Sequence, residues 1–377
     1  MIPPQQVLRQ FPAHDFSLEG FFSARLPSRI DDTVIEAEGR SLTWAQFADQ
    51  ADRTEAWLQQ HGVGEGDRVG LMAFNDPATP VLLLACARLG AILVPCNPEV
   101  SADDAHYIFC HAQVMGVLCS VEALERVEQA LAGVAAPTAV GAELHANGER
   151  PPWITLLDAL PIHAGSAIAT KPATAEGITA SQAAPPVARR GTADHTLFIL
   201  YTSGTTGFPK GVMHSQRSYV LTAEAFVQRL YLQPDERVLC VLPLFHINAL
   251  MYSLGGALAC GGTLIMVRCL SASTFWHMVA QTRATEVNVI MSAAAILARR
   301  PPEEFVAGHH LRTMFITPLN RSLLEALQQR FGVPTLVECY GMTEIPGTVG
   351  ELVVRTPTLM QGYWRDQQQT AAASIDG

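Results

Sequence analysis

Short apolar runs alternate with helix-forming segments along most of this chain, and this alternation restricts the fold more than any other feature. Strand-like runs at 68–73, 91–95 and 115–119 are separated by helical patterns at 79–89 and 102–111. Consecutive parallel strands need a crossover connection, usually a helix, so this order predicts α/β units with mostly parallel strands. The length of 377 residues predicts more than one packed unit.

The same alternation continues to the end of the chain. A helical pattern at 121–131 closes the first series. Further strands are predicted at 197–201, 237–242, 263–267, 287–290, 311–316 and 335–338. Further helices are predicted at 216–231, 249–259, 272–284, 292–299 and 321–331. Ser215 and Ser271 are predicted N-caps of two of these helices. After Thr348 the sequence predicts a strand (ELVVR), a turn region and a short Gln/Ala helix.

Residues 161–193 interrupt the pattern, because they are rich in Ala, Pro, Thr, Ser and Gly. Such a composition is typical of a linker, here between a subdomain at 1–160 and a second at 194–345. A loosely packed loop inside one domain is the alternative reading of the same composition.

Charge and composition exclude several classes of protein. The formal net charge of −10, from 35 acidic and 25 basic residues, is opposite in sign to a nucleic-acid-binding surface. The longest uncharged stretch, 238–267, contains Pro243 and two Gly-Gly pairs, so it is expected to divide into strand, helix and strand and not to span a membrane. None of the eight cysteines has C-x-x-C spacing, which predicts buried free thiols and no zinc site. The first fifteen residues contain no apolar run typical of a signal peptide, so a cytoplasmic protein is expected.

The strongest local motif is Tyr201-Thr-Ser-Gly-Thr-Thr-Gly-Phe-Pro-Lys-Gly211, which directly follows an apolar strand. Glycines allow backbone N–H groups to turn toward an anion, and Lys210 adds a positive charge. We therefore predict a phosphate-binding loop, with contacts from Thr202, Ser203, Gly204, Thr205, Thr206, Gly207 and Lys210.

Two other kinds of loop fit this sequence less well. An ordinary surface loop rarely combines so many donors with a lysine. A Walker A loop would need Gly-Lys-Ser/Thr opening a helix, whereas Lys210 is followed by Gly211 and a strand-like run. The sequence therefore excludes a P-loop nucleoside triphosphatase.

With three further motifs in order, the chain resembles the adenylate-forming superfamily of acyl-CoA synthetases, peptide-synthetase adenylation domains and luciferases. These motifs are Pro243-Leu-Phe-His-Ile-Asn248, Tyr340-Gly-Met-Thr-Glu344, and Gly350-Glu-Leu-Val-Val354 with Gln361-Gly-Tyr-Trp364. The resemblance implies the amino-terminal fold of that family, with two stacked α/β subdomains. The segment 271–284 and Phe331-Gly-Val333 are similar to the crotonobetaine/carnitine-CoA ligase branch.

The resemblance also implies roles for individual residues. His246 would border the acyl pocket, Tyr340 would stack on adenine, and Thr343 would donate to the α-phosphate of ATP. Glu344, a hard oxygen ligand, would hold Mg²⁺. The nucleotide-binding set would also include Gly341 and Met342, and the catalytic set would be Lys210, His246, Thr343 and Glu344.

The chain also departs from the family pattern. Only four residues, 345–348, separate Glu344 from the Val349-Gly-Glu-Leu block, where family members have several dozen that build a barrel-like subdomain. Residues 346–377 are therefore expected to form an incomplete third subdomain. The family's later Thr-Gly-Asp motif and its small lid domain with a catalytic lysine are expected to be absent. Thr317 and Pro318 replace a glycine-rich stretch that contacts the nucleotide.

The function implied is the ATP-dependent activation of a carboxylic acid to an acyl-adenylate and then to acyl-CoA, within fatty acid or related metabolism. ATP, coenzyme A and a small acid would be the partners, with Mg²⁺ as cofactor, and a homo-oligomer is compatible with the sequence. Given the departures, we expect impaired thioester formation. An inactive nucleotide-binding pseudoenzyme and a carrier-protein-loading adenylation domain are the alternatives.

Overall fold

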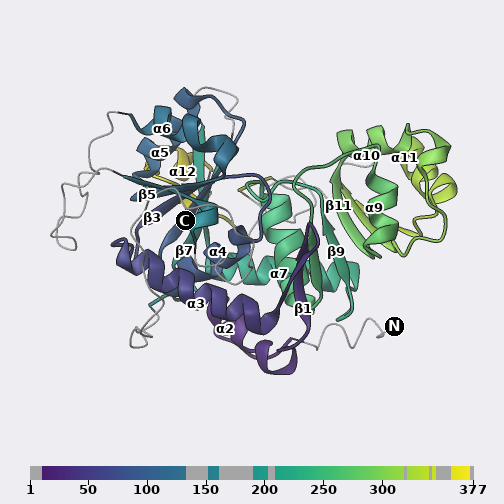
Figure 1. Ribbon diagram of the computed structural model, residues 1–377, viewed down its shortest axis with the longest axis horizontal. Helices are drawn as coiled ribbons and strands as arrows, with labels where there is room; N and C mark the ends of the chain where they lie inside the picture. The colour runs from purple at the N-terminus through teal and green to yellow at the C-terminus, as the bar shows by residue number, and fades with distance from the viewer. Residues whose placement is uncertain are drawn as a thin grey trace, which may run out of the picture.

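The computed structural model describes residues 11–132, 152–160, 190–202, 209–317, 321–338, 342–344 and 358–373. Its strands form two mixed sheets in which parallel pairs predominate, flanked and separated by helices (Figure 1). The α/β prediction is confirmed. No helix in these described segments is both long and apolar enough to cross a membrane.

The first sheet has the strand order β14-β8-β7-β4-β3-β5-β6. Its pairs are parallel from β7 through β6, and antiparallel where β7 meets β8 and β8 meets β14. The strands are β3 (Arg68–Met72), β4 (Ile92–Cys96), β5 (Gly116–Cys119), β6 (Trp153–Leu156), β7 (Thr196–Thr202), β8 (Lys210–Ser215) and β14 (Gly362–Tyr363).

The second sheet has the strand order β13-β12-β11-β9-β10-β1-β2, and only β1 and β2 pair in antiparallel fashion. Its strands are β1 (Thr33–Ala37), β2 (Arg40–Thr43), β9 (Arg237–Cys240), β10 (Thr263–Met266), β11 (Glu286–Ile290), β12 (Thr313–Thr317) and β13 (Thr335–Glu338).

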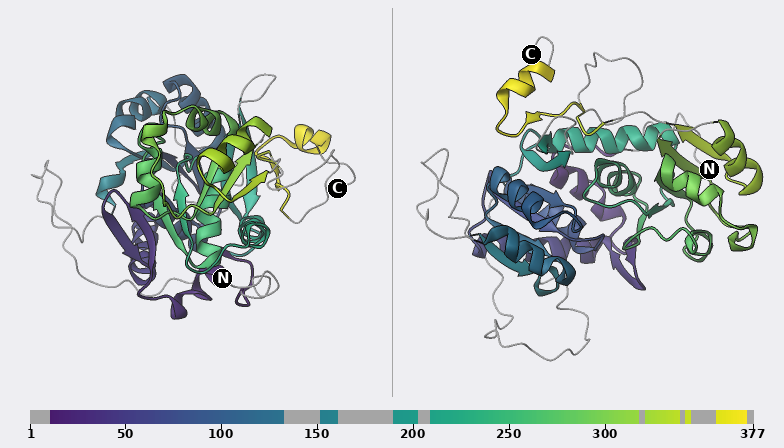
Figure 2. Two further views of the ribbon diagram at one scale, coloured as in Figure 1. Left: turned by 90° about the vertical axis from the view of Figure 1, so that its right-hand side faces the viewer. Right: turned by 90° about the horizontal axis from the view of Figure 1, so that it is seen from above.

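Each sheet draws strands from both halves of the chain. The early strands β1 and β2 join the second sheet beside β10, whereas β7 and β8, which follow residue 190, join the first sheet beside β4. The tail strand β14 lies at the edge of the first sheet, at the edge of the molecule in both views of Figure 2. The subdomain bounds 1–160 and 194–345 stay a prediction.

The helices α4 and α7 lie between the two sheets (Figure 1). Every residue of α4 is buried, which explains why its sequence is apolar on all sides. The α-helices are α2 (Leu18–Ser23), α3 (Trp44–Gln60), α4 (Ala78–Leu89), α5 (Ala102–Ala112), α6 (Leu124–Leu131), α7 (Gln216–Leu230), α8 (Gly255–Cys260), α9 (Phe275–Gln281), α10 (Met291–Ala298), α11 (Arg321–Glu325) and α12 (Gln367–Ala373).

Shorter helical turns complete the described elements. Two are π-helices: η5 (Asn248–Leu254), which continues into α8, and η7 (Ala326–Arg330), which follows α11. The others are the 3₁₀ turns η1 (Leu26–Ser28), η2 (Val121–Ala123), η3 (Leu157–Ala159) and η6 (Pro302–Glu304). The helices predicted at 249–259 and 321–331 are thus present, with π-helical turns in place of part of each.

Two predicted caps have different outcomes. Ser215 caps α7 as predicted, because its hydroxyl accepts from the Ser218 backbone N–H. Ser271 does not cap α9, since that helix begins later and Thr274 is its N-cap. The predicted Gln/Ala helix is confirmed as α12, whereas the predicted strand at 351–355 and most of the predicted linker at 161–193 lie outside the described residues.

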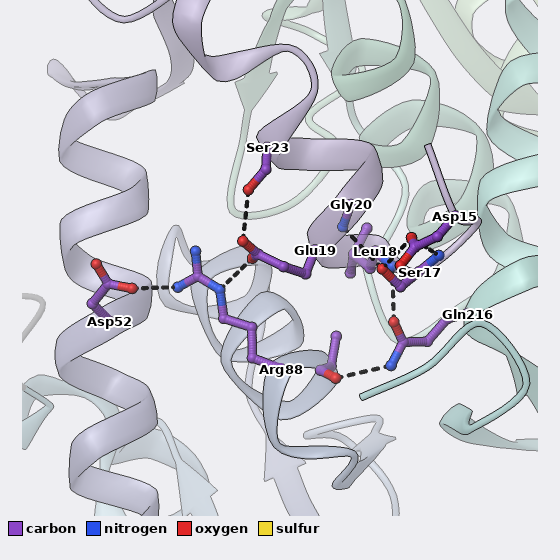
Figure 3. A network of polar contacts seen from close by, with 10 residues as sticks. Asp15, Ser17, Leu18, Glu19, Gly20, Ser23, Asp52, Arg88 and Gln216 are labelled. Carbon is purple, nitrogen blue, oxygen red and sulfur yellow. Dashed lines mark hydrogen bonds and ion pairs between the residues drawn. The ribbon is translucent and has the colours of Figure 1, made fainter. Parts of the chain in front are cut away.

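A polar network joins the amino-terminal segment to the rest of the fold (Figure 3). The guanidinium of Arg88, at the end of α4, donates to Glu19 of α2 at 2.5 Å and to Asp52 of α3 at 2.8 Å. Gln216 at the start of α7 accepts from the Leu18 backbone N–H and donates to the Ala87 carbonyl. The buried Arg88 cation, of which only 3% is exposed, therefore joins α2, α3 and α4, and Gln216 joins α7 to α2 and α4.

The predicted free thiols are confirmed where the structure describes them. Seven cysteines in the described segments are free, and five of these are buried: Cys86, Cys96, Cys119, Cys240 and Cys260. Cys339 lies outside the described residues.

Candidate functional site: the β7–β8 hairpin and its docked tail

The β7–β8 hairpin carries the predicted phosphate loop between its two strands. Thr202, the last residue of β7, pairs directly with Lys210, the first residue of β8. Residues 203–208, which include Ser203, Gly204, Thr205, Thr206 and Gly207, lie outside the described residues. Lys210 begins a strand and not a helix, so the exclusion of a Walker A loop is confirmed.

Gly211 lets the chain pack closely at the base of this loop. A Cβ atom at this position would lie 2.8 Å from Ile199 Cγ2 and 3.1 Å from Tyr201 Cζ. It would also lie 3.3 Å from Cβ of Trp364, in the carboxy-terminal tail. Glycine is therefore required here by space, since contacts below about 3 Å force neighbouring atoms to move.

The tail, residues 358–373, docks against β8 through its backbone. Gln361 donates to the Met213 carbonyl at 2.8 Å, and Trp364 donates to the Gly211 carbonyl at 2.7 Å. The Trp364 indole also donates to the His111 carbonyl at the end of α5, at 3.0 Å. These bonds place Tyr363 against β8, near Lys210.

Tyr363 connects two of the predicted site residues. Its hydroxyl donates to Glu344 Oε1 at 3.0 Å, and the ammonium nitrogen of Lys210 lies 5.2 Å from the centre of its ring. Burial, the Glu344 charge and the hydrogen bond raise the pKa of Tyr363 to about 12. The phenol therefore stays protonated near neutral pH and acts as a donor.

His214 holds the segment that contains Thr343 and Glu344. This imidazole is fully buried on β8, and one ring nitrogen lies 2.7 Å from the Thr343 carbonyl oxygen. The other ring nitrogen lies 3.1 Å from the Ser218 hydroxyl, which itself donates to the Thr358 carbonyl. Burial lowers the pKa of His214 to about 4, so the ring is neutral at pH 7.

Thr202 and Lys210 pair at the loop end of the hairpin, and Tyr363 lies between Lys210 and Glu344. Thr343 is held by His214, four residues further along β8. The backbone N–H of Met360 donates to the Glu344 carbonyl at 3.0 Å, which fixes the same segment to the tail. The predicted residue Met342 is exposed, with 46% of its surface accessible. The predicted Tyr340 and Gly341, like Pro318, lie outside the described residues, and Thr317 ends β12.

His246 lies on a different loop, between β9 and η5, and makes no described contact with Lys210 or Glu344. Its side chain is exposed, and partial desolvation lowers its pKa. The ring lies 4.8 Å from the Phe245 ring. Its role at an acyl pocket stays a prediction.

Asn75 fixes this loop to the other sheet. It follows β3 in the first sheet, yet its amide donates to the carbonyls of Leu242 and Val267, both at 3.0 Å, and accepts from the Leu244 backbone N–H at 2.8 Å. Leu242 and Val267 follow β9 and β10 of the second sheet. One buried side chain therefore joins the carboxyl ends of both sheets, where open α/β sheets usually bind ligands.

The donor set near Glu344 suits Mg²⁺ bound together with nucleotide. Glu344 has one carboxylate oxygen on Tyr363, and no partner is seen for the other within the described part of the chain. In the same part no three His, Cys, Asp or Glu side chains gather to form a metal cage. Mg²⁺ usually takes one or two carboxylates plus substrate phosphates, so the single carboxylate of Glu344 would fit this ion if ATP phosphates bind near Lys210.

The model of the family described as AMP-binding enzyme matches residues 22–347, most of the chain. The chain belongs to the AMP-binding enzyme family. The resemblance to acyl-CoA synthetases, first indicated by the four motifs, is thereby confirmed.

Curated relatives of this AMP-binding enzyme are CoA ligases. It is 28% identical to indoleacetate–CoA ligase of Aromatoleum aromaticum, over 92% of this chain and 71% of the relative. It is 31% identical to sulfoacetate–CoA ligase of Cupriavidus necator, over 81% and 55%, and 29% identical to crotonobetaine/carnitine–CoA ligase of Escherichia coli, over 84% and 59%. The match thus spans only a little over half the length of the sulfoacetate and crotonobetaine/carnitine ligases.

Solved structures show the same fold. The N-terminal domain of FACL13 from Mycobacterium tuberculosis aligns with a TM-score of 0.74 at 22% identity, covering 100% of this chain and 94% of that one. ATP-bound MatB from Rhodopseudomonas palustris aligns with a TM-score of 0.73 at 23% identity, covering 94% and 74%. The AMP-binding enzyme therefore has the architecture of the amino-terminal domain of such proteins.

Three residues of this site were missed by sequence reasoning. Tyr363 lies in the motif Gln361-Gly-Tyr-Trp364, which the sequence analysis identified without assigning a role to the tyrosine. His214 follows Lys210 by four residues on a strand, a position where burial could be expected. Asn75 gave no signal, because all its partners are distant in sequence.

Proposed function

We propose that this AMP-binding enzyme activates a carboxylic acid with ATP to give an acyl-adenylate, and that the acyl group is then transferred to coenzyme A to form acyl-CoA. The observation that carries the proposal is the position of Lys210 and Glu344 on either side of Tyr363, at the hairpin that carries the predicted phosphate loop. The curated relatives, which are CoA ligases, support coenzyme A as the acyl acceptor.

In this mechanism the chain positions charge and does little covalent chemistry. The loop at 202–210 would hold the ATP phosphates, and Lys210 would stabilise the negative charge that develops as the carboxylate attacks the α-phosphorus. The bond from phosphorus to pyrophosphate breaks as the acyl–oxygen–phosphorus bond forms, so the pyrophosphate leaves with the electron pair.

Glu344 would hold Mg²⁺ beside these phosphates, and the ion would supply additional neutralisation of phosphate charge. Thr343, whose carbonyl is fixed by His214, would present its hydroxyl to the α-phosphate. The second half-reaction, attack of the coenzyme A thiol on the acyl carbonyl, would release AMP.

The acid is proposed to be small and polar or aromatic, because the relatives act on indoleacetate, sulfoacetate and crotonobetaine or carnitine. His246, near the carboxyl end of β9, is proposed to border its pocket. We also propose a cytoplasmic location, because the described cysteines are free thiols, which suits a reducing compartment.

The test is exchange of labelled pyrophosphate into ATP, measured with a panel of carboxylic acids that includes the relatives' substrates. We expect exchange that depends on one class of acid and on Lys210, with Lys210→Ala reducing the rate by about 10²–10³. ATP binding without exchange for any acid would support a nucleotide-binding pseudoenzyme. Exchange followed by loading of a carrier protein, and not coenzyme A, would support the adenylation-domain alternative.

A further inference from the structure

Tyr363 is held rigidly between the two charged groups of the candidate site. Its backbone pairs with Val212 of β8, and its N–H donates to the Thr370 hydroxyl of α12 at 2.9 Å. Flanking hydrogen bonds from Gln361 and Trp364 to β8 fix the chain on either side. The position of the ring therefore follows from the backbone, before any ligand binds.

The hydroxyl and the ring of Tyr363 contact different groups. The hydroxyl fixes the Glu344 carboxylate through a hydrogen bond of 3.0 Å, and the ring face lies near the Lys210 ammonium, 5.2 Å from the ring centre. Aromatic faces attract cations at such distances. One residue thus contacts both the proposed metal ligand and the proposed phosphate ligand.

We propose that Tyr363 is a positioning residue of the nucleotide site, which orients Glu344 through its hydroxyl and Lys210 through its ring. This inference rests on the proposed binding of ATP and Mg²⁺ at these residues. A carboxylate on a rotatable side chain loses affinity when its orientation is free, because the entropy of ordering it must then be offset on binding.

The alternative effect of the hydroxyl has the opposite sign. A hydrogen bond to one carboxylate oxygen reduces the negative charge available to a bound metal ion. Removal of the hydroxyl would then tighten metal binding. Measurement of Mg²⁺ dependence decides between orientation and competition, because the two predict changes in opposite directions.

The experiment is calorimetric titration of ATP into the full chain at a series of Mg²⁺ concentrations, with no turnover needed. Tyr363→Phe keeps the ring and removes the hydroxyl. We expect it to raise the Mg²⁺ concentration at half-maximal enhancement of ATP affinity roughly three- to tenfold, as expected for the loss of one hydrogen bond of ordinary net strength. ATP affinity without metal should stay within about twofold, because the Lys210 contact is retained.

Tyr363→Leu removes the ring as well and should also weaken metal-free ATP binding, by roughly two- to fivefold. Tyr231→Phe is the matched control, since Tyr231 is half exposed and lies at the far end of α7. It should change neither quantity, and thermal unfolding of all variants reports whether they fold.

A double-mutant cycle with Glu344→Gln separates this inference from the proposed function. Tyr363→Phe should add nothing to the Mg²⁺ dependence in the Glu344→Gln background. If Glu344→Gln alone leaves the Mg²⁺ dependence unchanged, the metal assignment fails and the inference fails with it. If Glu344→Gln changes it and Tyr363→Phe leaves it unchanged or lowers the Mg²⁺ requirement, only the role of Tyr363 is overturned.

Discussion

Replacement of Asn75 by alanine should separate the carboxyl edges of the two sheets. The side chain is 9% exposed and makes three hydrogen bonds to the backbone of the second sheet's loops. Asn75→Ala leaves two carbonyls and one N–H without these partners. Leu242 and Leu244 are buried, so water cannot easily replace the lost bonds there, whereas Val267 is only half buried.

The expected cost follows from the number of groups left unsatisfied. A buried polar group without a partner costs about 1–3 kcal/mol. The buried Leu244 N–H is left without one, and the Leu242 carbonyl keeps only the weak Cys240 thiol donor. We therefore expect a loss of about 3 kcal/mol in the free energy of unfolding, measured as a shift of the urea midpoint.

Asn97→Ala is the matched control for this measurement. Asn97 also follows a parallel strand of the first sheet, but its amide oxygen accepts one local hydrogen bond, from the Glu99 backbone N–H at 2.9 Å. Its replacement should cost much less. If the midpoints of Asn75→Ala and Asn97→Ala shift equally, Asn75 does not hold the sheets together and the reasoning is refuted.

Two further predictions concern buried charge. Burial lowers the pKa of His214 from 6.5 to about 4, so the unfolded chain binds a proton between these pH values that the folded chain does not. Stability should fall by up to about 3 kcal/mol as the pH drops from 6.5 to 4, and urea titrations of His214→Gln should lack this part of the pH dependence. Arg88→Met should cost about 3 kcal/mol in the same assay, because the largely buried Glu19, 15% exposed, loses its cation. Arg53→Met, which breaks an exposed pair, should change the midpoint little.

Sequence reasoning could predict the elements that depend on local pattern. The strands on either side of the phosphate loop and the Ser215 cap were predicted because apolar runs and capping residues act within a few positions. The Ser271 cap was predicted wrongly, since Ser271 and Thr274 are both plausible caps and packing decides where α9 begins. The π-helical turns of η5 were not predicted, because their apolar residues satisfy an α-helical pattern equally well.

The contacts that complete the site depend on residues far apart in sequence. Tyr363 meets Lys210 across more than 150 positions only because β14 pairs with β8. Asn75 meets Leu242 only because two sheets from interleaved parts of the chain face each other. Such pairings are properties of the folded topology, and no local pattern in one sequence encodes them.

The central claim, that ATP binds with its phosphates at the β7–β8 hairpin, can be tested by covalent labelling. The chain contains only two lysines, Lys171 and Lys210. An acyl-phosphate derivative of ATP transfers its acyl group to a lysine near the bound phosphates, and peptide mass spectrometry then identifies the acylated residue. The account predicts acylation of Lys210, suppressed by excess ATP with Mg²⁺, and no ATP-sensitive acylation of Lys171. Labelling of Lys210 that ATP does not suppress, or ATP-sensitive labelling confined to Lys171, would contradict it.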